Sequence, residues 1–325
     1  MDADLVLEGG GVKGIGLVGA YTVLKEEGYA FHRIAGTSAG AIVGALAAAD
    51  IPISEIQRIM REVDYGKFQD RSFLDHLGLV GQGLSTLFEK GIFEGDYLTK
   101  WLGDLLASQG KETFADLKLD DPGSGLAPEQ SYRLVVMASD VSRGRLVRLP
   151  WDYPQYGLNP DDQSIAEAVR ASMSIPFFYE PIKLETKDGE EDSVSYVVDG
   201  GMLSNFPVGV FDRKDDTPPR WPTFGIKLSA RPDSAQKQRF EIDGLLDFAR
   251  AIVGTMMTWS DQMHIDDESV LARTMFVDTT GVRATDFDLD EQTQERLYEE
   301  GRDSAVDFLK DWDFQRYVEQ YRKPS

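Results

Sequence analysis

The chain has 325 residues, of which 42% are hydrophobic and 28% are charged, and it contains no cysteine. This composition is typical of a globular protein and excludes the disordered, collagen-like and disulfide-scaffold classes. Without cysteine there is no disulfide, no thiolate nucleophile and no Cys-ligated metal cluster. The net charge is −22, and a surface this acidic repels the phosphates of nucleic acids. We therefore expect no nucleic-acid partner.

The beginning of the chain predicts two strand–turn–helix units. Residues 5–7 form a short apolar strand that leads into Gly9-Gly10-Gly11, and residues 14–27 carry apolar side chains at helical spacing. The second unit consists of a strand, a tight turn and a helix at 33–35, 36–40 and 41–49. Two such units in succession predict an α/β fold with a parallel sheet.

The rest of the chain predicts further elements of the same kind. Residues 53–110 contain helical and irregular apolar clusters, and residues 120–130 form a surface loop. We expect strands at 132–138, 146–149, 193–198 and 222–228, and helices at 164–170, 245–263 and 291–309. Because no repeat or linker interrupts this series, we expect residues 1–325 to form a single domain.

Two observations bear on location in the cell. The first residues lack the basic and apolar regions of a secretory signal, and no run reaches the roughly 18 to 20 apolar residues of a membrane helix. We therefore expect a cytoplasmic protein, or one that is peripheral at a membrane.

A serine at the second turn is the first candidate nucleophile. Gly36-Thr37-Ser38-Ala39-Gly40 matches the pattern G-x-S-x-G where a strand turns into a helix. A sharp turn exposes the Ser38 hydroxyl, the glycines let neighbouring elements approach, and the helix directs its N-terminus at that serine. The same pattern also suits a serine that only caps a helix.

The glycine-rich segment Gly9-Gly10-Gly11-Val12-Lys13-Gly14 matches G-x-G-x-x-G. A dinucleotide site would require an acidic residue at the end of the second strand, which leads instead into Thr37 and Ser38. A phosphate-binding P-loop would require Ser or Thr after Lys13. The remaining interpretation is an oxyanion hole, in which backbone amides at the start of a helix converge on a developing negative charge.

A carboxylate at the end of a later strand is the candidate base. Asp199 follows the apolar segment Tyr196-Val197-Val198 and precedes Gly200 and Gly201. We expect partial desolvation of this carboxylate. An Asp-Gly pair is also a common turn, so this motif alone does not assign a role.

Taken together, these motifs resemble those of the patatin-like phospholipase family. That family has a GGGxRG-type loop, a GxSxG serine and a DGG or DGA aspartate in this order. The block from Ala171 to Phe178 resembles its ASxSIPxxF motif, and Asn205-Phe206-Pro207 is also similar. The resemblance covers roughly residues 4–230, and residues 245–325 lie outside its diagnostic motifs. One difference is Lys13, where many members have an arginine that can bind phosphate with two parallel bonds.

The resemblance implies a three-layer α/β/α fold with a central, mostly parallel sheet and helices on both faces. It also implies a Ser–Asp dyad that hydrolyses fatty-acyl esters through an acyl-enzyme, with no calcium or other cofactor. Ser38 would attack the ester carbonyl and Asp199 would accept its proton. Because an Asp with the usual pKa of about 3.9 is a weak base, we expect burial to raise the pKa of Asp199. The expected oxyanion donors are the amides of Gly9, Gly10, Gly11 and Ala39.

Other mechanisms and function classes stay open. A Ser38–Asp199–His264 triad would have the chain order of α/β-hydrolases. His32, His76 and His264 are the only histidines, and His264 lies in an acidic helical stretch with no catalytic-loop signature around it. We expect no metal site, because these three histidines are scattered. The other class is a nucleotide-binding or non-catalytic regulatory protein that keeps the scaffold.

The resemblance implies phospholipids, lysophospholipids or short aryl esters as substrates. The candidate lid is the apolar stretch from Leu84 to Phe93. The net charge argues against broad adsorption to anionic bilayers, but a local patch can still dock transiently to a membrane or micelle. No protein partner can be inferred. The candidate substrate-binding residues are Lys13, Gly14, Met173, Phe177 and Phe178, and the candidate basic patch, or solvated hairpin, contains Arg143, Arg145 and Arg148.

Overall fold

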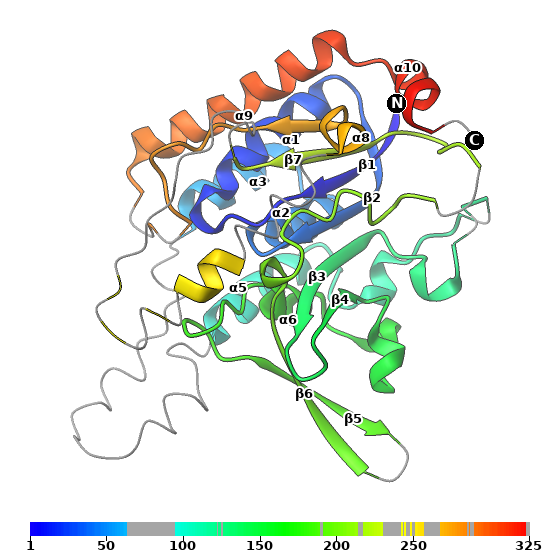
Figure 1. The fold of residues 1–325 in the computed structure, drawn as a ribbon, viewed down its shortest axis with the longest axis vertical. Helices are drawn as coiled ribbons and strands as arrows, with labels where there is room; N and C mark the ends of the chain where they lie inside the picture. Colours follow the sequence, from blue (N-terminus) through cyan, green and yellow to red (C-terminus); the bar gives the residue numbers. More distant parts are fainter. Residues whose placement is uncertain are drawn as a thin grey trace.

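The structure is a computed structural model, and Figure 1 shows a central sheet with helices packed around it. The residues that it describes are 1–63, 95–121, 123–124, 126–188, 191–213, 217–229, 242, 244, 248, 251–256, 267–284, 286 and 289–322.

Eight strands form the sheet in the order β5-β6-β3-β2-β1-β7-β8, with β4 paired to β3 beside this path. The pairs β1–β2, β2–β3, β1–β7 and β7–β8 are parallel, and those of β3 with β4 and β6, and of β5 with β6, are antiparallel. The expected mostly parallel sheet is therefore confirmed. The strands are β1 (Asp2–Leu7), β2 (Ala30–Thr37), β3 (Leu134–Asp140), β4 (Arg145–Leu149), β5 (Ile182–Asp188), β6 (Glu191–Asp199), β7 (Thr223–Lys227) and β8 (Thr274–Phe276).

The sheet is the middle layer of a three-layer α/β/α fold. Successive residues of β7 point to opposite faces. Phe224 contacts the rings of Phe308 and Trp312 on one face, while the space above Gly225 is filled by Phe206 on the other face. The helices are α1 (Gly14–Glu26), α2 (Ala39–Ala48), α3 (Ile53–Glu62), α5 (Asp96–Ala107), α6 (Ile165–Ser172), α8 (Glu268–Leu271), α9 (Glu291–Asp311) and α10 (Phe314–Tyr321).

Local sequence explains where the helices begin and why they pack. The Ser164 hydroxyl accepts a hydrogen bond from the N–H of Glu167 at the start of α6, and the Asp290 carboxylate does the same for Thr293 at the start of α9. α2 consists mainly of alanine and glycine and is buried along its whole length. Side chains this small let the helix lie directly on the sheet.

Strand β3 brings two distant parts of the chain end to end. Residues 136–140 of β3 pair with β4, so β2 and β6 share the other edge of β3. On that edge β2 ends with Thr37 opposite Met137, and β6 arrives from the opposite direction and ends with Asp199 opposite Ala138. Because Met137 and Ala138 are adjacent, the turn after β2 and the turn after β6 meet at one point.

Most expected elements are present, with boundaries that differ by a few residues. Four of the described helices and strands were not expected from the sequence, namely β5, α8, β8 and α10. The expected helix at 245–263 lies largely outside the described residues. Within this range the structure describes residues 248 and 251–256, and these are helical. The N-terminal segment forms strand β1 of the sheet, and Phe308 of α9 packs on Phe224 of β7 in the same sheet. The single domain over 1–325 stays a prediction.

Candidate active site

Ser38 lies in a strained turn between β2 and α2. Its backbone angles are φ 52° and ψ −123°, a region that costs a non-glycine residue about 1–3 kcal/mol. Two hydrogen bonds hold the turn in this conformation. The Ser38 N–H donates to the hydroxyl of Ser172 over 2.8 Å, and the Thr37 hydroxyl donates to the carbonyl of Ser204 over 3.2 Å. The G-x-S-x-G segment therefore forms a sharp nucleophile elbow.

The two glycines of the elbow are required by close backbone packing. A Cβ on Gly36 would lie 2.3 Å from the carbonyl oxygen of Gly40, and a Cβ on Gly40 would lie 2.4 Å from that of Leu7. Any side chain would push α2 away from β1 and β2. Both residues therefore have the packing role that the sequence predicted for them.

Asp199 is completely buried at the end of β6. Its N–H donates to the carbonyl of Ser174 over 2.9 Å, and its Oδ1 accepts the N–H of Gly201 over 2.7 Å. No described residue donates a hydrogen bond to Oδ2. Burial raises the pKa of Asp199 to about 7, although the Gly201 N–H and the Ser38 hydroxyl both act to lower it. Gly200 lies so close to Met137 that a Cβ there would be 2.4 Å from that residue's carbonyl oxygen.

The Ser38 hydroxyl lies near enough to Asp199 to lower the pKa of that carboxyl, but its hydrogen bond goes to another residue. The Ser38 hydroxyl donates to the sulfur of Met173 over 3.4 Å. Only 2% of Ser38 is exposed, so the expectation of an exposed turn serine is wrong. The elbow points the side chain into the protein.

The glycine-rich loop after β1 contacts this turn. A Cβ on Gly9 would lie 3.1 Å from the Cβ of Ser38 and 2.2 Å from the side-chain oxygen of Asn205. Gly11 has φ 55°, and a Cβ there would be 2.0 Å from the carbonyl oxygen of Ala284. Only glycine therefore fits at these two positions, and the loop lies directly beside Ser38.

The backbone amides of this loop divide into bound and available donors. The N–H of Gly9 donates to the carbonyl of Asn205 over 3.2 Å, so the expectation that Gly9 is an oxyanion donor is wrong. The amide groups of Val12 and Lys13 are also bound, to the carbonyls of Ala284 and Gly10. Within the described part of the chain, no acceptor lies opposite the amides of Gly10, Gly11 and Ala39.

The remaining expected site residues have different surroundings. Met173 is buried and contacts the Ser38 hydroxyl. Phe177, with φ 68°, and Phe178 are half-buried on the segment that follows. The Lys13 ammonium donates to the carbonyl of Leu228 over 3.2 Å, an internal contact that the phosphate-binding interpretation did not anticipate. Gly14 is the first residue of α1 and is buried.

The structure describes one of the three histidines, His32. His32 contacts Asp2 over 2.8 Å and stacks on Trp221, at the end of the sheet remote from Ser38. His76, His264 and the candidate lid from Leu84 to Phe93 lie outside the described residues. In the described ranges, no cluster of His, Asp and Glu side chains is suited to hold a metal ion. No helix in those ranges has the length and apolar character to cross a membrane.

The three arginines around β4 contact the protein itself. The guanidinium groups of Arg143 and Arg145 lie 4.7 Å and 5.2 Å from the ring centre of Tyr156, and Arg148 pairs with Asp152 over 2.9 Å. β3 and β4 form the expected hairpin. Its three arginine side chains are partly exposed, and their charged groups also contact the protein itself.

Two residues that hold the site together were not singled out from the sequence. Ser172 binds the Ser38 backbone, and Asn205 binds both the N–H and the carbonyl of Gly9. Both lie in the short motifs that resemble the patatin-like family, which was the only signal of their importance. Their partners are more than a hundred positions away in the chain, so local pattern could not reveal them.

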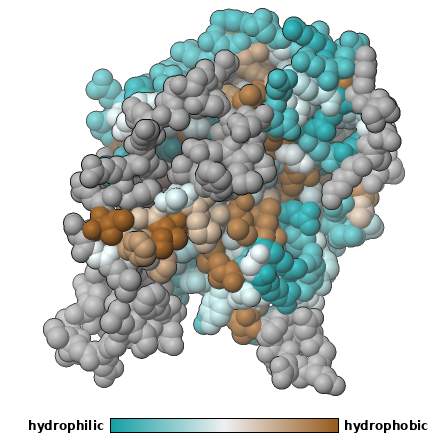
Figure 2. All heavy atoms as spheres, viewed as in Figure 1, coloured by the Kyte–Doolittle hydropathy of each residue, from teal (hydrophilic) through white to brown (hydrophobic). Residues whose placement is uncertain are grey.

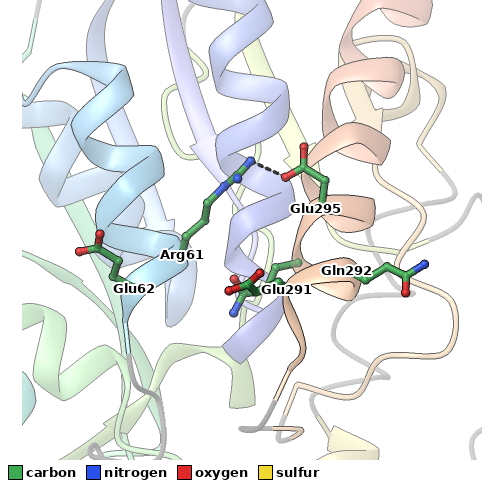
Figure 3. Close-up of a pocket in the computed structure, with 6 residues that line it drawn as sticks. Arg61, Glu62, Glu291, Gln292 and Glu295 are labelled. Atoms are coloured by element: carbon green, nitrogen blue, oxygen red, sulfur yellow. Dashed lines mark ion pairs between the residues drawn. The ribbon is translucent and has the colours of Figure 1, made fainter.

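A separate hollow of about 560 Å³ lies between the end of α3 and the beginning of α9, away from Ser38 (Figure 3). Arg61 reaches across it and pairs with Glu295 over 2.5 Å. A charged lining does not suit an acyl chain. The lining residues are Arg61, Glu62, Glu291, Gln292, Gln294 and Glu295.

Comparisons with known proteins identify relatives in sequence and in fold. The protein YqhO of Bacillus subtilis (strain 168) is 40% identical over 316 residues, which cover 97% of this chain and 100% of YqhO. The NTE family protein Mb2594 of Mycobacterium bovis is 27% identical over 207 residues, 63% of this chain and 27% of that protein. VipD from Legionella pneumophila shares the fold, with a TM-score of 0.50 at 19% identity over 95% of this chain and 66% of VipD.

The family model for patatin-like phospholipase matches residues 5–212, which is more than half of the chain. This match includes the glycine-rich loop, the Ser38 elbow and the Asp199 turn. The chain belongs to the patatin-like phospholipase family, a family of lipid hydrolases.

Proposed function

We propose that the protein is a serine lipid acyl hydrolase in which Ser38 is the nucleophile and Asp199 is the general base. The observation that carries this proposal is the state of Asp199. It is fully buried, its pKa is raised to about 7, and one of its oxygens has no described hydrogen-bond donor. A general base works best when its pKa is close to the operating pH. The strained Ser38 turn meets this carboxylate along the edge of β3.

The proposed reaction has two steps. The Ser38 oxygen attacks the ester carbonyl while Asp199 accepts the hydroxyl proton, and the amides of Gly10, Gly11 and Ala39 stabilise the negative oxygen. Asp199 then gives the proton to the departing alcohol, which leaves an acyl ester on Ser38. In the second step Asp199 accepts a proton from water, which attacks this ester. The fatty acid leaves as Asp199 returns that proton to the Ser38 oxygen, which restores both residues. One oxyanion donor is typically worth about 2.7–4 kcal/mol of barrier lowering.

The substrate class that we propose is a fatty-acyl ester of a phospholipid, lysophospholipid or short aryl alcohol. Figure 2 shows apolar side chains on the face where Figure 1 draws the helical residues 251–256. Phe248, Ile252 and Met256 are exposed there at a spacing of four residues, which places them on one side of a helix. Such a row supports transient contact with a micelle or membrane. Comparing hydrolysis below and above the critical micelle concentration of a lysophospholipid tests this contact.

The test of the proposed function is reaction with a fluorophosphonate, which requires an activated serine. We expect stoichiometric labelling of Ser38, identified by mass spectrometry, together with hydrolysis of a p-nitrophenyl ester. Ser38→Ala should lose both reactions and keep its fold. Ser108→Ala, which changes an exposed serine after α5, is the matched control and should keep both. A regulatory protein that only keeps the scaffold would show neither reaction, and that result would refute the proposal.

A further inference from the structure

A buried ion pair lies next to the glycine-rich loop, and the proposed mechanism does not use it. Glu8 is the residue between β1 and the loop, and Lys227 is the last residue of β7. Their charged groups are bonded to each other, and the two side chains are only 2% and 1% exposed. The second carboxylate oxygen of Glu8 accepts the backbone N–H of Leu228. Both carboxylate oxygens of Glu8 are thus bound at the end of β7, one by its last residue and one by the residue that follows it.

Lys13, on the other side of the three glycines, binds the backbone of the same residue, Leu228. Its ammonium donates to the carbonyl of Leu228 over 3.2 Å, and the Thr279 hydroxyl donates to that carbonyl over 2.9 Å. The N–H of Leu228 therefore donates a hydrogen bond to Glu8, and the carbonyl of Leu228 accepts one from Lys13. We call this arrangement of Glu8, Lys13, Lys227 and Leu228 the Leu228 clamp.

The Leu228 clamp lies against the part of the loop that carries the amides of Gly10 and Gly11. The side chain of Leu228 fills the space beside Gly10, where a Cβ would lie 2.5 Å from its terminal methyl group. Glu8 and Lys13 are the nearest charged residues on either side of Gly10 and Gly11 in the chain. A shift of the Leu228 backbone would therefore move both ends of this loop at once.

We propose that Glu8 and Lys13 are positioning residues, which hold the amides of Gly10 and Gly11 in place through the Leu228 clamp. This inference rests on the proposed function. A buried ion pair contributes little to stability compared with a well-packed apolar pair, because both charges must leave water. It does impose one geometry, and a misplacement of about 1 Å at an active site can cost on the order of a hundredfold in rate.

The experiment compares kinetics of Glu8→Gln with those of a matched variant on the same strand. Glu8→Gln keeps the shape of the side chain and removes the charge that binds Lys227. The control is Asp4→Asn, because Asp4 is 1% exposed, pairs with Arg33, and lies about 13 Å back along β1. The substrate is a p-nitrophenyl ester, which has no phosphate, and Ser38 labelling by a fluorophosphonate is measured in parallel.

We expect kcat of Glu8→Gln to fall about 10- to 100-fold with KM changed less than about twofold. Labelling of Ser38 should slow by a similar factor, because the phosphonate oxygen needs the same amides. Asp4→Asn should keep kcat within about twofold even if both variants melt at a lower temperature. An equal fall in both variants, or a change in KM alone, would overturn the inference.

Lys13→Gln gives a second, independent readout that does not depend on the folding of Glu8→Gln. We expect about a tenfold lower kcat on the same ester. Because this substrate lacks phosphate, the fall cannot come from a lost phosphate contact. Normal rates in Lys13→Gln on this ester would refute the clamp. An inert wild-type protein would refute the proposed function as well, whereas an active wild type with an unaffected Lys13→Gln would refute the clamp alone.

Discussion

Replacing Asp199 by asparagine should make the protein more stable at alkaline pH while it abolishes ester hydrolysis. Asparagine keeps the shape of the side chain and the oxygen that accepts the Gly201 N–H over 2.7 Å. It removes the charge that the fully buried site disfavours. The gain in stability should therefore depend on pH, because the wild-type carboxyl becomes charged only as the pH rises.

The size of this effect follows from the pKa of Asp199, which burial raises from 3.8 to about 7. Below pH 3.8 the carboxyl is neutral in the folded and the unfolded chain, and it contributes nothing to the pH dependence. Between 3.8 and about 7 only the unfolded chain loses the proton, so the free energy of unfolding falls as the pH rises. At 1.36 kcal/mol per pH unit the total loss is about 4 kcal/mol above pH 7.

Urea unfolding of the wild type and of Asp199→Asn at pH 5 and pH 9 measures this difference. We expect the advantage of the variant to be about 3 kcal/mol larger at pH 9, since part of the loss has already occurred at pH 5. Ser38→Ala, which also abolishes catalysis, should show at least the wild-type pH dependence, because the buried carboxyl remains and a hydroxyl that lowers its pKa is removed. Asp104→Asn, at an exposed position of α5, controls for net charge. An advantage that is equal at both pH values would refute a buried carboxylate with a raised pKa, and with it the general-base role.

Three further predictions follow from the same geometry. The value of kcat/KM should rise with pH in a single transition whose midpoint is near pH 7. Replacing His32, His76 and His264 together should leave that midpoint unchanged. Loss of the pH dependence in this triple variant would instead support the triad. Ser172→Ala should lower the free energy of urea unfolding by about 1–3 kcal/mol, because the buried N–H of Ser38 loses its acceptor, and an unchanged value would show that this bond does not hold the elbow. Activity should persist in excess EDTA without nucleotide, and strict calcium dependence would contradict the dyad.

The two proposed catalytic residues could be found from the sequence because each one interrupts a strongly apolar segment. Ser38 follows an apolar segment and has a glycine two positions away on either side, and Asp199 ends an apolar segment that leads directly into two glycines. This pattern depends only on neighbours in the chain, so it can be interpreted without a fold. The same is true of residues 5–7 of β1 and of α2, which are apolar or small.

Elements that depend on a partner could not be found in this way. β5 alternates charged and apolar residues and extends only because it pairs with β6, and β8 has three residues that pair with β7. Short strands of this kind gain their hydrogen bonds from another strand, so their own residues carry little signal.

The proposed catalytic residues could be selected from local sequence, whereas their arrangement in space depends on the tertiary structure. Antiparallel β6 places Asp199 opposite Ala138, next to the end of β2, which no local pattern specifies. Ser38 is buried in the folded protein, and the N–H of Gly9 donates to the carbonyl of Asn205. The physical reason is that burial and hydrogen-bond partners come from segments more than a hundred residues apart, whereas turn and helix propensities come from adjacent residues.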